Sequence, residues 1–464
     1  MGMMNQFEGK NVLVMGYAMT GKSVIEYLLN QGAIVALTAQ EDLSQDPSLD
    51  PFYEQGLLVV DKGHPLELLD RPWDFIVKNP GIPYSVPFIQ AALDKQIPTY
   101  TDVEIAGWAN PGCFIGITGS NGKTTTTQLI YDIFQKVDDF QTYLAGNIGV
   151  PILQSISQMT AQDTLVAELS SFQLEGTQAL HPHIAVITNI YQAHLDYHGS
   201  INKYRQAKLK LIANMTASDI IIYNYDQDGL HDWLADHPAV KIPVAMTKVD
   251  DFAKKAGITC ENGIISYQGH EVFHTRDIPI PGDHNIMNVM MAMAASLSAQ
   301  IDLSKVIEGV TNYQGVAHRI QPIGQFKGRR FYNDSKATNT VATITALKSF
   351  QEPVIYIGGG LDRGNGFDDL IPYTQYIKQA YLYGQTKEKM AQSLEKVGRI
   401  KIHLLDNLQE ATLAAYQAAQ ENHVVLFSPA CASWDQFDNF EERGNVFTDL
   451  IHQLITQEDT ADNS

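Results

Sequence analysis

A short apolar run, a glycine-rich turn and a helix-like segment follow one another three times along the chain. The three examples are NVLVMGYAMTGKS (residues 11–23), CFIGITGSNGKTT (113–125) and PVIYIGGGLDRGN (353–365). Strands that lead into helices through glycine turns are typical of right-handed βαβ units on a mainly parallel sheet. The sequence therefore predicts an α/β protein built from three such domains.

The length of the chain agrees with three domains. It has 464 residues, whereas one domain usually holds about 100 to 200 residues. The pattern of apolar runs loosens near residues 101–110, before the second glycine turn, and a third set of strand candidates starts near Gly315. We therefore place the domains at residues 1–104, 105–314 and 315–464.

Charge and composition exclude several classes of function. The net charge of −20 argues against a nucleic-acid partner or an anionic membrane, because either partner needs a basic face. The first ten residues lack the apolar run of a signal peptide, and no stretch reaches the roughly 18 apolar residues of a membrane helix, so we expect a cytoplasmic protein. The three cysteines show no C-x-x-C spacing and are expected to be buried free thiols. The polar tail, residues 457–464, is expected to fray.

Two of the glycine turns contain Gly-Lys, and they differ in the residues that would lie beside a bound phosphate. The first, GYAMTGKS (residues 16–23), fits the phosphate-loop formula G-x-x-x-x-G-K-[ST], whereas GITGSNGKTTTT (116–127) has Ile117 where the formula requires glycine. Binding needs bare backbone beside the phosphate, and Tyr, Ala and Met follow the first glycine of the first loop. We expect this loop to hold a diphosphate at a helix N-terminus, with Lys22 on the helix surface.

The second loop has the donors that a nucleoside triphosphate needs. Its glycines let backbone amides approach an oxyanion, the following helix adds its dipole, Lys123 can bridge phosphates, and Thr124 or Thr125 can ligate Mg²⁺. Ile117 would then lie in the preceding strand. The alternative is a tight strand-to-helix connection whose lysine is solvated. The residues expected to bind ATP here are Gly119, Ser120, Asn121, Gly122, Lys123, Thr124 and Thr125.

Several longer runs resemble the Mur ligase family, the ATP-dependent enzymes that add amino acids to peptidoglycan precursors. They are GITGSNGKTTT, GNIG, ELSSFQLE, TNIYQAHLDYHGS, YRQAKLKL, GDHNIMN, AHR, NDSKATN and LFSPACASWDQFDNFEERGNVF. They extend over all three predicted domains, and ELSSFQLE and the last run are most like the branch that adds D-glutamate. The resemblance implies a Rossmann-like N-terminal domain for the UDP substrate, a central ATP-binding domain of the P-loop type, and a Rossmann-like C-terminal domain for the amino acid.

The resemblance also implies a reaction. An enzyme of this branch transfers the γ-phosphate of ATP to the L-alanine carboxylate of UDP-N-acetylmuramoyl-L-alanine, and D-glutamate then attacks the acyl phosphate. ATP and Mg²⁺ are the implied cofactors, and we expect a monomer. The chemistry is mainly the neutralisation of negative charge by metal ions, a lysine and main-chain donors.

The implied catalytic residues are Lys123, Glu168, His194 and Lys208. Glu168, His194, Thr124 and Lys208 would serve the metal sites, with Lys208 as a carbamate, which requires a neutral amine. Without the resemblance, Lys208 lies on an amphipathic helix whose lysines are normally solvated, and a hydrogen-bonded structural role is the default for His194 and His198.

The remaining residue roles come from the resemblance alone. The ATP contacts are Asn285 and Asn288 at the adenine, Arg319 at the phosphates, Asp334 at the ribose and Lys336 nearby. The substrate contacts are Met19, Thr20 and Asn147 for the UDP substrate, and Thr338, Arg363, Ser433 and Phe440 for D-glutamate. Two departures are notable: Arg363 lies at a different offset from the lysine of some members, and ALTAQED carries Thr38 and Ala39 where many members have an acidic residue.

Three other functions compete with this one. A folylpolyglutamate synthase shares the phosphate loop and the modified lysine, but the UDP-type first domain and SPACASWDQF argue against it. A non-catalytic relative would be expected to lack Lys123, Glu168, His194 or Lys208, and all four are present. A plain ATPase or kinase is disfavoured because no apolar run ending in Asp resembles a Walker B strand.

Overall fold

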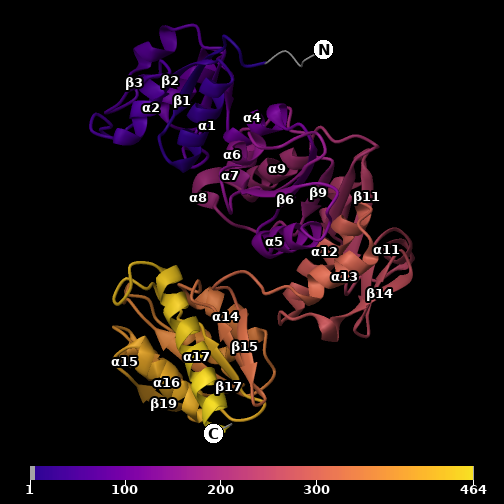
Figure 1. Cartoon of the computed structure of the whole chain (residues 1–464), viewed down its shortest axis with the longest axis vertical. Coiled ribbons are helices and arrows are strands. Elements are labelled where there is room, and N and C mark those ends of the chain that lie inside the picture. Colours follow the sequence, from indigo (N-terminus) through magenta and orange to yellow (C-terminus); the bar gives the residue numbers. More distant parts are fainter. Residues whose placement is uncertain (1–5, 463–464) are drawn as a thin grey trace. The chain divides into compact units, whose positions relative to one another are not determined.

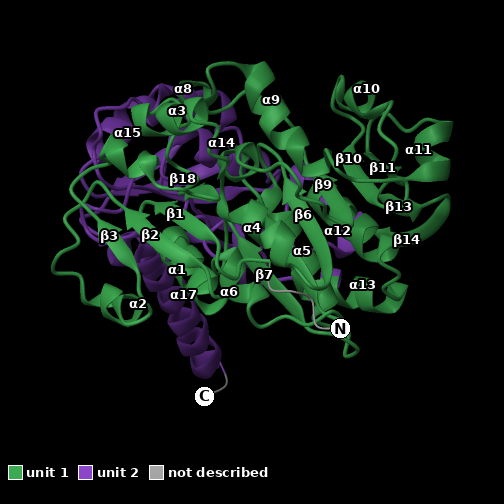
Figure 2. Cartoon of the chain, turned by 90° about the horizontal axis from the view of Figure 1, so that it is seen from above, with its two compact units in different colours: residues 1–274, 287–309 green, residues 275–286, 310–464 purple. Residues whose placement is uncertain are grey.

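The computed structural model describes residues 6–462, and its described part contains three β-sheets (Figure 1). The chain divides into two compact units, Met1–His274 with Met287–Gly309, and Thr275–Ile286 with Val310–Ser464 (Figure 2). The predicted α/β class with mainly parallel sheets is confirmed. The domain boundaries at residues 104 and 314 stay predictions. Within residues 6–462, no helix is both long enough and apolar enough to cross a membrane.

The first sheet has five strands in the order β3-β2-β1-β4-β5, all parallel. The strand order changes direction beside β1, so the turn that follows β1 lies at a topological switch point, where α/β sheets bind ligands. That turn is the GYAMTGKS loop. The elements are β1 Asn11–Met15, α1 Met19–Asn30, β2 Ile34–Thr38, α2 Asp50–Tyr53, β3 Leu58–Val60, β4 Phe75–Lys78, α3 Pro87–Asp94, β5 Thr99–Tyr100 and α4 Asp102–Ala109.

The second sheet has nine strands in the order β14-β13-β12-β11-β10-β9-β6-β8-β7. The strands from β7 to β12 are parallel, and β13 and β14 add an antiparallel edge. Register pairs Ile117 with Glu168 and Thr118 with Ile187, so the carboxyl ends of β6, β8 and β9 meet at one edge. The strands are β6 Cys113–Thr118, β7 Thr142–Gly146, β8 Thr164–Glu168, β9 Ile184–Ile187, β10 Ile220–Asn224, β11 Val240–Ala245, β12 Ile258–Glu261, β13 Ile264–Tyr267 and β14 His270–His274.

Helices α5 to α13 accompany the second sheet. Met290, Met291 and Met293 of α12 are fully buried, so these methionines fill a core. The chain passes between the two compact units inside α12, between Ile286 and Met287, and again inside α13, between Gly309 and Val310. The helices are α5 Lys123–Phe134, α6 Ile152–Ile156, α7 Ser171–Glu175, α8 Leu195–His198, α9 Ile201–Leu209, α10 Leu230–Leu234, α11 Asp251–Ala256, α12 Asp283–Ser298 and α13 Leu303–Thr311.

The third sheet has the order β15-β16-β20-β17-β18-β19, parallel except for β15. Alternate residues of β17 belong to two separate hydrophobic clusters, Tyr356 to one and Ile355 to the other, so both faces of the sheet are covered. The elements are β15 Gln321–Phe326, β16 Arg329–Asn333, α14 Thr340–Lys348, β17 Val354–Gly359, β18 Ile377–Tyr383, α15 Lys387–Glu395, β19 Lys401–Leu404, α16 Leu408–Ala418, β20 Val424–Phe427 and α17 Phe440–Asp462.

The expectation of a frayed tail was wrong for its described part. Helix α17 continues to Asp462, although the sequence there is polar. Glu458 accepts hydrogen bonds from Lys327 at 2.9 Å and from Arg329 at 2.6 Å. These contacts come from β16 and the turn before it, so the tail is ordered by residues about 130 positions earlier in the chain.

Candidate active site

The loop between β6 and α5 is built so that glycine is required at two positions. Gly119 has a φ of 155°, and a Cβ there would lie 1.8 Å from Oγ1 of Thr188. Gly122 has a φ of 82°, and a Cβ there would lie 2.3 Å from Oδ1 of Asn288. Both positions therefore combine a backbone conformation that side chains rarely adopt with a close approach of a neighbour. Ile117 lies in β6, as predicted, and is fully buried.

The segment that follows β9 holds this loop in place. The amide of Ser120 donates to the carbonyl of Asn189 at 2.8 Å, and the amide of Asn121 donates to Oδ1 of Asn189 at 2.9 Å. Oγ1 of Thr188 donates to the carbonyl of Asn121 at 2.6 Å. Nζ of Lys123 turns back over the loop and donates to the carbonyls of Gly119 and Ser120 at 3.0 and 3.1 Å. The lysine therefore stands over the loop on whose amides a phosphate would rest.

Glu168, the last residue of β8, is buried with only one carboxylate oxygen satisfied. Oε1 accepts from Nδ2 of Asn147 at 2.9 Å, whereas Oε2 is buried and accepts no hydrogen bond. The amide of Asn147 also donates to the carbonyl of Glu168 at 2.8 Å. A buried carboxylate oxygen without a donor is costly unless a cation or proton joins it. Because Mg²⁺ prefers oxygen ligands and keeps several waters, this oxygen fits a magnesium site.

Lys208 of α9 is buried, with 1% of its surface exposed. Its Nζ donates to the carbonyl of Gly119 at 2.6 Å and lies 4.8 Å from the centre of the Tyr204 ring. Burial, helped by the nearby Lys123 ammonium and opposed by the Glu168 carboxylate, lowers the pKa of Lys208 to about 6. The expectation of a solvated lysine, drawn from the helix pattern, was therefore wrong, and only the family resemblance singled out this residue.

The two histidines near α8 differ. His194 is exposed, has a φ of 51° and precedes the helix, with its ring 4.9 Å from that of Phe172. His198 is buried, its Nε2 lies 3.0 Å from Oγ of Ser171, and its ring stacks on Phe172, which agrees with the structural role that was its default. Residues 6–462 contain no group of three or more His, Cys, Asp or Glu side chains that could hold a metal.

The predicted adenine contacts lie on α12. Asn288 is buried, and its Oδ1 accepts from Oγ1 of Thr126 at 3.4 Å, directly beside Gly122 of the loop. Asn285 is also buried, and its Nδ2 donates to the carbonyl of Pro281 at 2.7 Å. Asn288 therefore lies at the phosphate loop within the first unit, whereas Asn285 belongs to the second unit.

The remaining predicted ATP contacts belong to the second unit. Asp334 is buried, and its carboxylate accepts from the amide of Ile320 at 3.1 Å and from Oγ of Ser428 at 2.7 Å. Burial raises the pKa of Asp334 to about 7, although these hydrogen bonds oppose the shift. Arg319 and Lys336 are exposed, and Nζ of Lys336 lies 5.4 Å from the centre of the Phe440 ring.

The predicted D-glutamate contacts lie in loops of the same unit. The guanidinium of Arg363 lies over the ring of Trp434 at 4.7 Å, next to Ser433, which is buried. Thr338 and Phe440 are half-buried. The structure thus brings Arg363 close to the segment that contains Ser433, although these residues are 70 positions apart in the sequence.

The first glycine loop has a different geometry from the second. Gly16 has a φ of 94°, and a Cβ on Gly21 would lie 2.0 Å from the carbonyl oxygen of Gly16, so the turn is tight. Lys22 is exposed on α1, as predicted. Met19 is 72% exposed and Thr20 is half-buried. This loop therefore presents side chains at the turn and does not place its lysine over the backbone.

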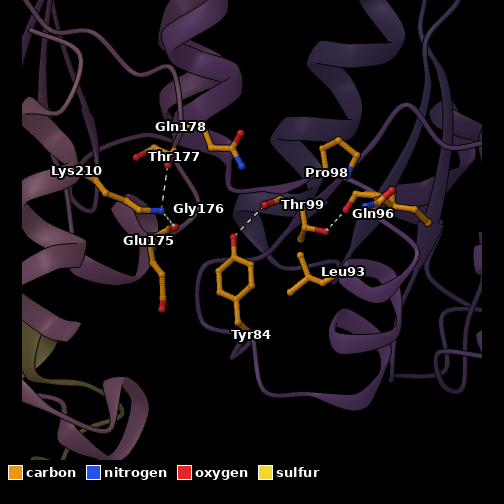
Figure 3. A pocket seen from close by; sticks show the side chains of 11 residues that line it. Tyr84, Leu93, Gln96, Pro98, Thr99, Glu175, Gly176, Thr177, Gln178 and Lys210 are labelled. Atoms are coloured by element: carbon orange, nitrogen blue, oxygen red, sulfur yellow. Dashed lines mark hydrogen bonds between the residues drawn. The ribbon is translucent and has the colours of Figure 1, made fainter.

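The first unit contains a pocket of about 270 Å³, lined by residues of the segments 84–99, 175–178 and Lys210 (Figure 3). Nζ of Lys210 donates to the carbonyl of Thr177 at 3.1 Å on one side of the pocket, and the hydroxyl of Tyr84 donates to the carbonyl of Thr99 at 3.0 Å on the other. None of the predicted site residues lines this pocket.

Sequence reasoning missed two residues that brace the site. The hydroxyl of Tyr204 lies 2.9 Å from Oγ of Ser120 in the loop, and its ring lies beside Lys208. Asn189 accepts hydrogen bonds from two amides of the same loop. Both residues lie in runs that carried the family resemblance, YRQAKLKL and TNIYQAHLDYHGS, so those runs were the available signal.

Comparisons with known proteins agree in all three parts of the chain. Family models match residues 10–101 (Mur ligase MurD-like, N-terminal domain), 117–296 (Mur ligase middle domain) and 318–431 (Mur ligase, glutamate ligase domain). A Geobacillus kaustophilus protein named UDP-N-acetylmuramoylalanine-D-glutamate ligase is 42% identical over 97% of this chain and 98% of its own length. A Staphylococcus saprophyticus protein of the same name is 43% identical over 95% of this chain and 96% of its own length.

Solved structures show the same fold at low sequence identity. The UDP-N-acetylmuramate-alanine ligase MurC of Thermotoga maritima has a TM-score of 0.56 and 17% identity, and covers 96% of this chain and 99% of its own. The MurF ligase of the same organism, solved in complex with ADP, has a TM-score of 0.55 and 14% identity, and covers 97% of each chain.

Proposed function

The chain belongs to the Mur ligase family, and on that premise we propose that it joins D-glutamate to UDP-N-acetylmuramoyl-L-alanine in peptidoglycan precursor synthesis, at the expense of ATP. The observation that carries this function is the match to relatives named for this reaction, at about 40% identity over nearly the whole chain. The glutamate ligase model matched at residues 318–431 supports the same acceptor.

Amide formation from a carboxylate needs activation. The γ-phosphate of ATP passes to an oxygen of the L-alanine carboxylate, which forms a C–O–P linkage and releases ADP. The amine of D-glutamate then attacks the acyl carbon, the C–O bond breaks, and inorganic phosphate leaves with that oxygen. The amides of residues 119–122 and the ammonium of Lys123 bind the β- and γ-phosphates in this proposal. The turn of Lys123 over the loop carbonyls supports the assignment.

We place Mg²⁺ at Glu168, with Thr124, His194 and Lys208 as further ligands or supports. The unsatisfied Oε2 of Glu168 supports this placement. When bound, the metal supplies positive charge against the phosphate oxygens. The burial of Lys208 supports its predicted modification, because a neutral amine can bond to CO₂ and become a carbamate, whose negative charge suits a metal site.

The substrates are assigned to separate loops. Met19 and Thr20 on the first glycine loop, and Asn147, are proposed to hold the UDP substrate. Thr338, Arg363, Ser433 and Phe440 are proposed to hold D-glutamate, and the stacking of Arg363 on Trp434 beside Ser433 supports this grouping. Asn285, Asn288, Arg319, Asp334 and Lys336 stay predicted ATP contacts. The monomeric state and the cytoplasmic location also stay predictions.

A phosphate-release assay tests the proposed function. The protein is given ATP and Mg²⁺ with UDP-N-acetylmuramoyl-L-alanine, with and without D-glutamate, and L-glutamate serves as the matched control. We expect sustained phosphate release only when the nucleotide substrate and D-glutamate are both present. Release that is independent of both substrates would contradict a ligase and indicate an ATPase.

A further inference from the structure

Arg443, in the first turn of α17, is a cation in the interior of the second unit. It has no exposed surface and is the largest fully buried side chain in the described structure. The salt bridges of the described residues do not include it. A buried charge is costly unless hydrogen bonds compensate for the lost water, so the partners of these hydrogen bonds indicate the role of this side chain.

The guanidinium joins two segments that are far apart in the sequence. Nε donates to Oγ of Ser335 at 3.0 Å and Nη2 donates to the carbonyl of Ser335 at 2.7 Å. Nη1 donates to the carbonyl of Cys431 at 3.0 Å. The planar fork of arginine thus spans both segments with fixed geometry, which a lysine, with a single nitrogen, cannot reproduce.

The first of these segments is also tied to the start of α17. Because Nε of Arg443 must donate, Oγ of Ser335 accepts that bond and gives its own proton to the carbonyl of Phe440 at 2.8 Å. Nδ2 of the buried Asn333 donates to the carbonyl of Gly444 at 2.9 Å. The turn after β16 therefore has its position set by the first turn of α17.

The two joined segments contain the predicted contacts to D-glutamate. Thr338 follows Ser335 by three positions, and Ser433 follows Cys431 by two. The loop that contains Arg363 is hydrogen-bonded to the second of these segments, because the amide of Leu361 donates to the carbonyl of Ala432 at 3.0 Å. Asp334 has separate supports in Ser428 and Ile320, so the predicted ribose contact does not depend on this arginine.

We propose that Arg443 is a positioning residue for the amino-acid acceptor: it fixes the spacing between residues 335–338 and 431–433 without touching the substrate. This inference rests on the proposed function, because it takes D-glutamate as the acceptor. Misplacing a binding group by about 1 Å can cost about a hundredfold in rate. Loss of the arginine hydrogen bonds should therefore act on the acceptor and spare the UDP substrate, which is assigned to other loops.

The test compares Arg443→Lys, which keeps the charge, and Arg443→Met, which keeps the volume, with Arg329→Met. Arg329 is a suitable control because it is also buried, in the same unit, but it bonds to Glu458 and Tyr416, away from both segments. For both Arg443 variants we expect kcat/KM for D-glutamate to fall about tenfold to a hundredfold, and KM for the UDP substrate to stay within about twofold. Hydrogen exchange should increase in residues 335–338 and 431–433.

Each outcome decides one of the two proposals. If the wild-type protein shows no dependence on D-glutamate, the proposed function fails. If the wild-type protein depends on D-glutamate and Arg443→Lys keeps its kcat/KM for D-glutamate, the positioning role is wrong. The role is also wrong if Arg329→Met shows the same selective loss, since general loosening of the unit would then explain it. If Arg443→Met does not fold, Arg443→Lys alone decides.

Discussion

Replacing Gly122 with alanine tests the assignment of the ATP site at a single atom. The new Cβ would lie 2.3 Å from Oδ1 of Asn288, far inside contact distance, at a backbone φ of 82°. Asn288 is buried and bonded to Thr126, so its amide must leave its place. The substitution therefore disturbs the phosphate loop and a predicted adenine contact together.

The size of the effect follows from these contacts. A left-handed backbone costs a non-glycine residue about 1–2 kcal/mol, and the lost hydrogen bond of Asn288 adds about 1 kcal/mol. A total of about 2–3 kcal/mol corresponds to a loss of about 30-fold to 150-fold in affinity for ATP if all of it weakens nucleotide binding. Part of it will appear as lost stability, so we expect the KM for ATP to rise at least about tenfold.

The control is Gly56→Ala in the same unit. Gly56 has a φ of 89°, but nothing lies within 4 Å of a Cβ built there, so only the backbone cost remains. Both variants are assayed for KM of ATP by phosphate release and for thermal unfolding with and without ATP. Without ATP we expect both variants to lose stability, Gly122→Ala more than Gly56→Ala, and we expect a raised KM for ATP only for Gly122→Ala. A Gly122→Ala protein with the wild-type KM for ATP would refute the placement of the nucleotide at this loop.

Three further predictions concern lysines and a buried carboxylate. Lys123→Ala should abolish ATP turnover whereas Lys22→Ala should keep it, as measured by phosphate release; the opposite result would mean that the two loops have been assigned the wrong way round. Lys208→Ala should lose at least about tenfold in ligase rate and regain part of it with small carboxylic acids such as acetate or propionate, and full activity in the variant would exclude the carbamate. Burial raises the pKa of Asp102 from 3.8 to about 6, so the folded protein binds the carboxyl proton of Asp102 more tightly than the unfolded chain does. The stability that this proton contributes is complete below about pH 4 and is lost as the pH rises through about 6. Relative to Asp102→Asn, the free energy of unfolding of the wild type should therefore fall by up to about 3 kcal/mol between pH 4 and pH 7, measured by urea unfolding, and a constant difference would contradict this.

Local features of the fold could be predicted from the sequence because they depend on neighbouring residues. Apolar runs that end in glycine turns identified the strands β1, β6 and β17 correctly, and the bulky residues after Gly16 indicated that its lysine would point away. The placement of Ile117 in a strand explains why the ATP-type loop departs from the written formula. Each of these features is determined by residues that lie within a few positions of it in the sequence.

Features that depend on distant contacts could not be predicted in this way. The burial of Lys208 comes from the packing of α9 against a loop about 90 positions earlier, which a helical pattern does not reveal. The run FEER at the start of α17 gives no sign that Arg443 is fully buried, because its partner Ser335 lies 108 positions away. Order in the polar tail depends likewise on Lys327 and Arg329.

The most direct test of the acyl-phosphate reaction follows an oxygen atom. UDP-N-acetylmuramoyl-L-alanine labelled with ¹⁸O in its carboxylate is turned over with ATP and D-glutamate, and the released phosphate is analysed by mass spectrometry. Because the C–O bond of the acyl phosphate breaks when the amine attacks, we predict one substrate-derived oxygen in each phosphate. Phosphate without the label, or with oxygen from ¹⁸O-labelled water instead, would contradict activation of the carboxylate by ATP and with it the ligase mechanism.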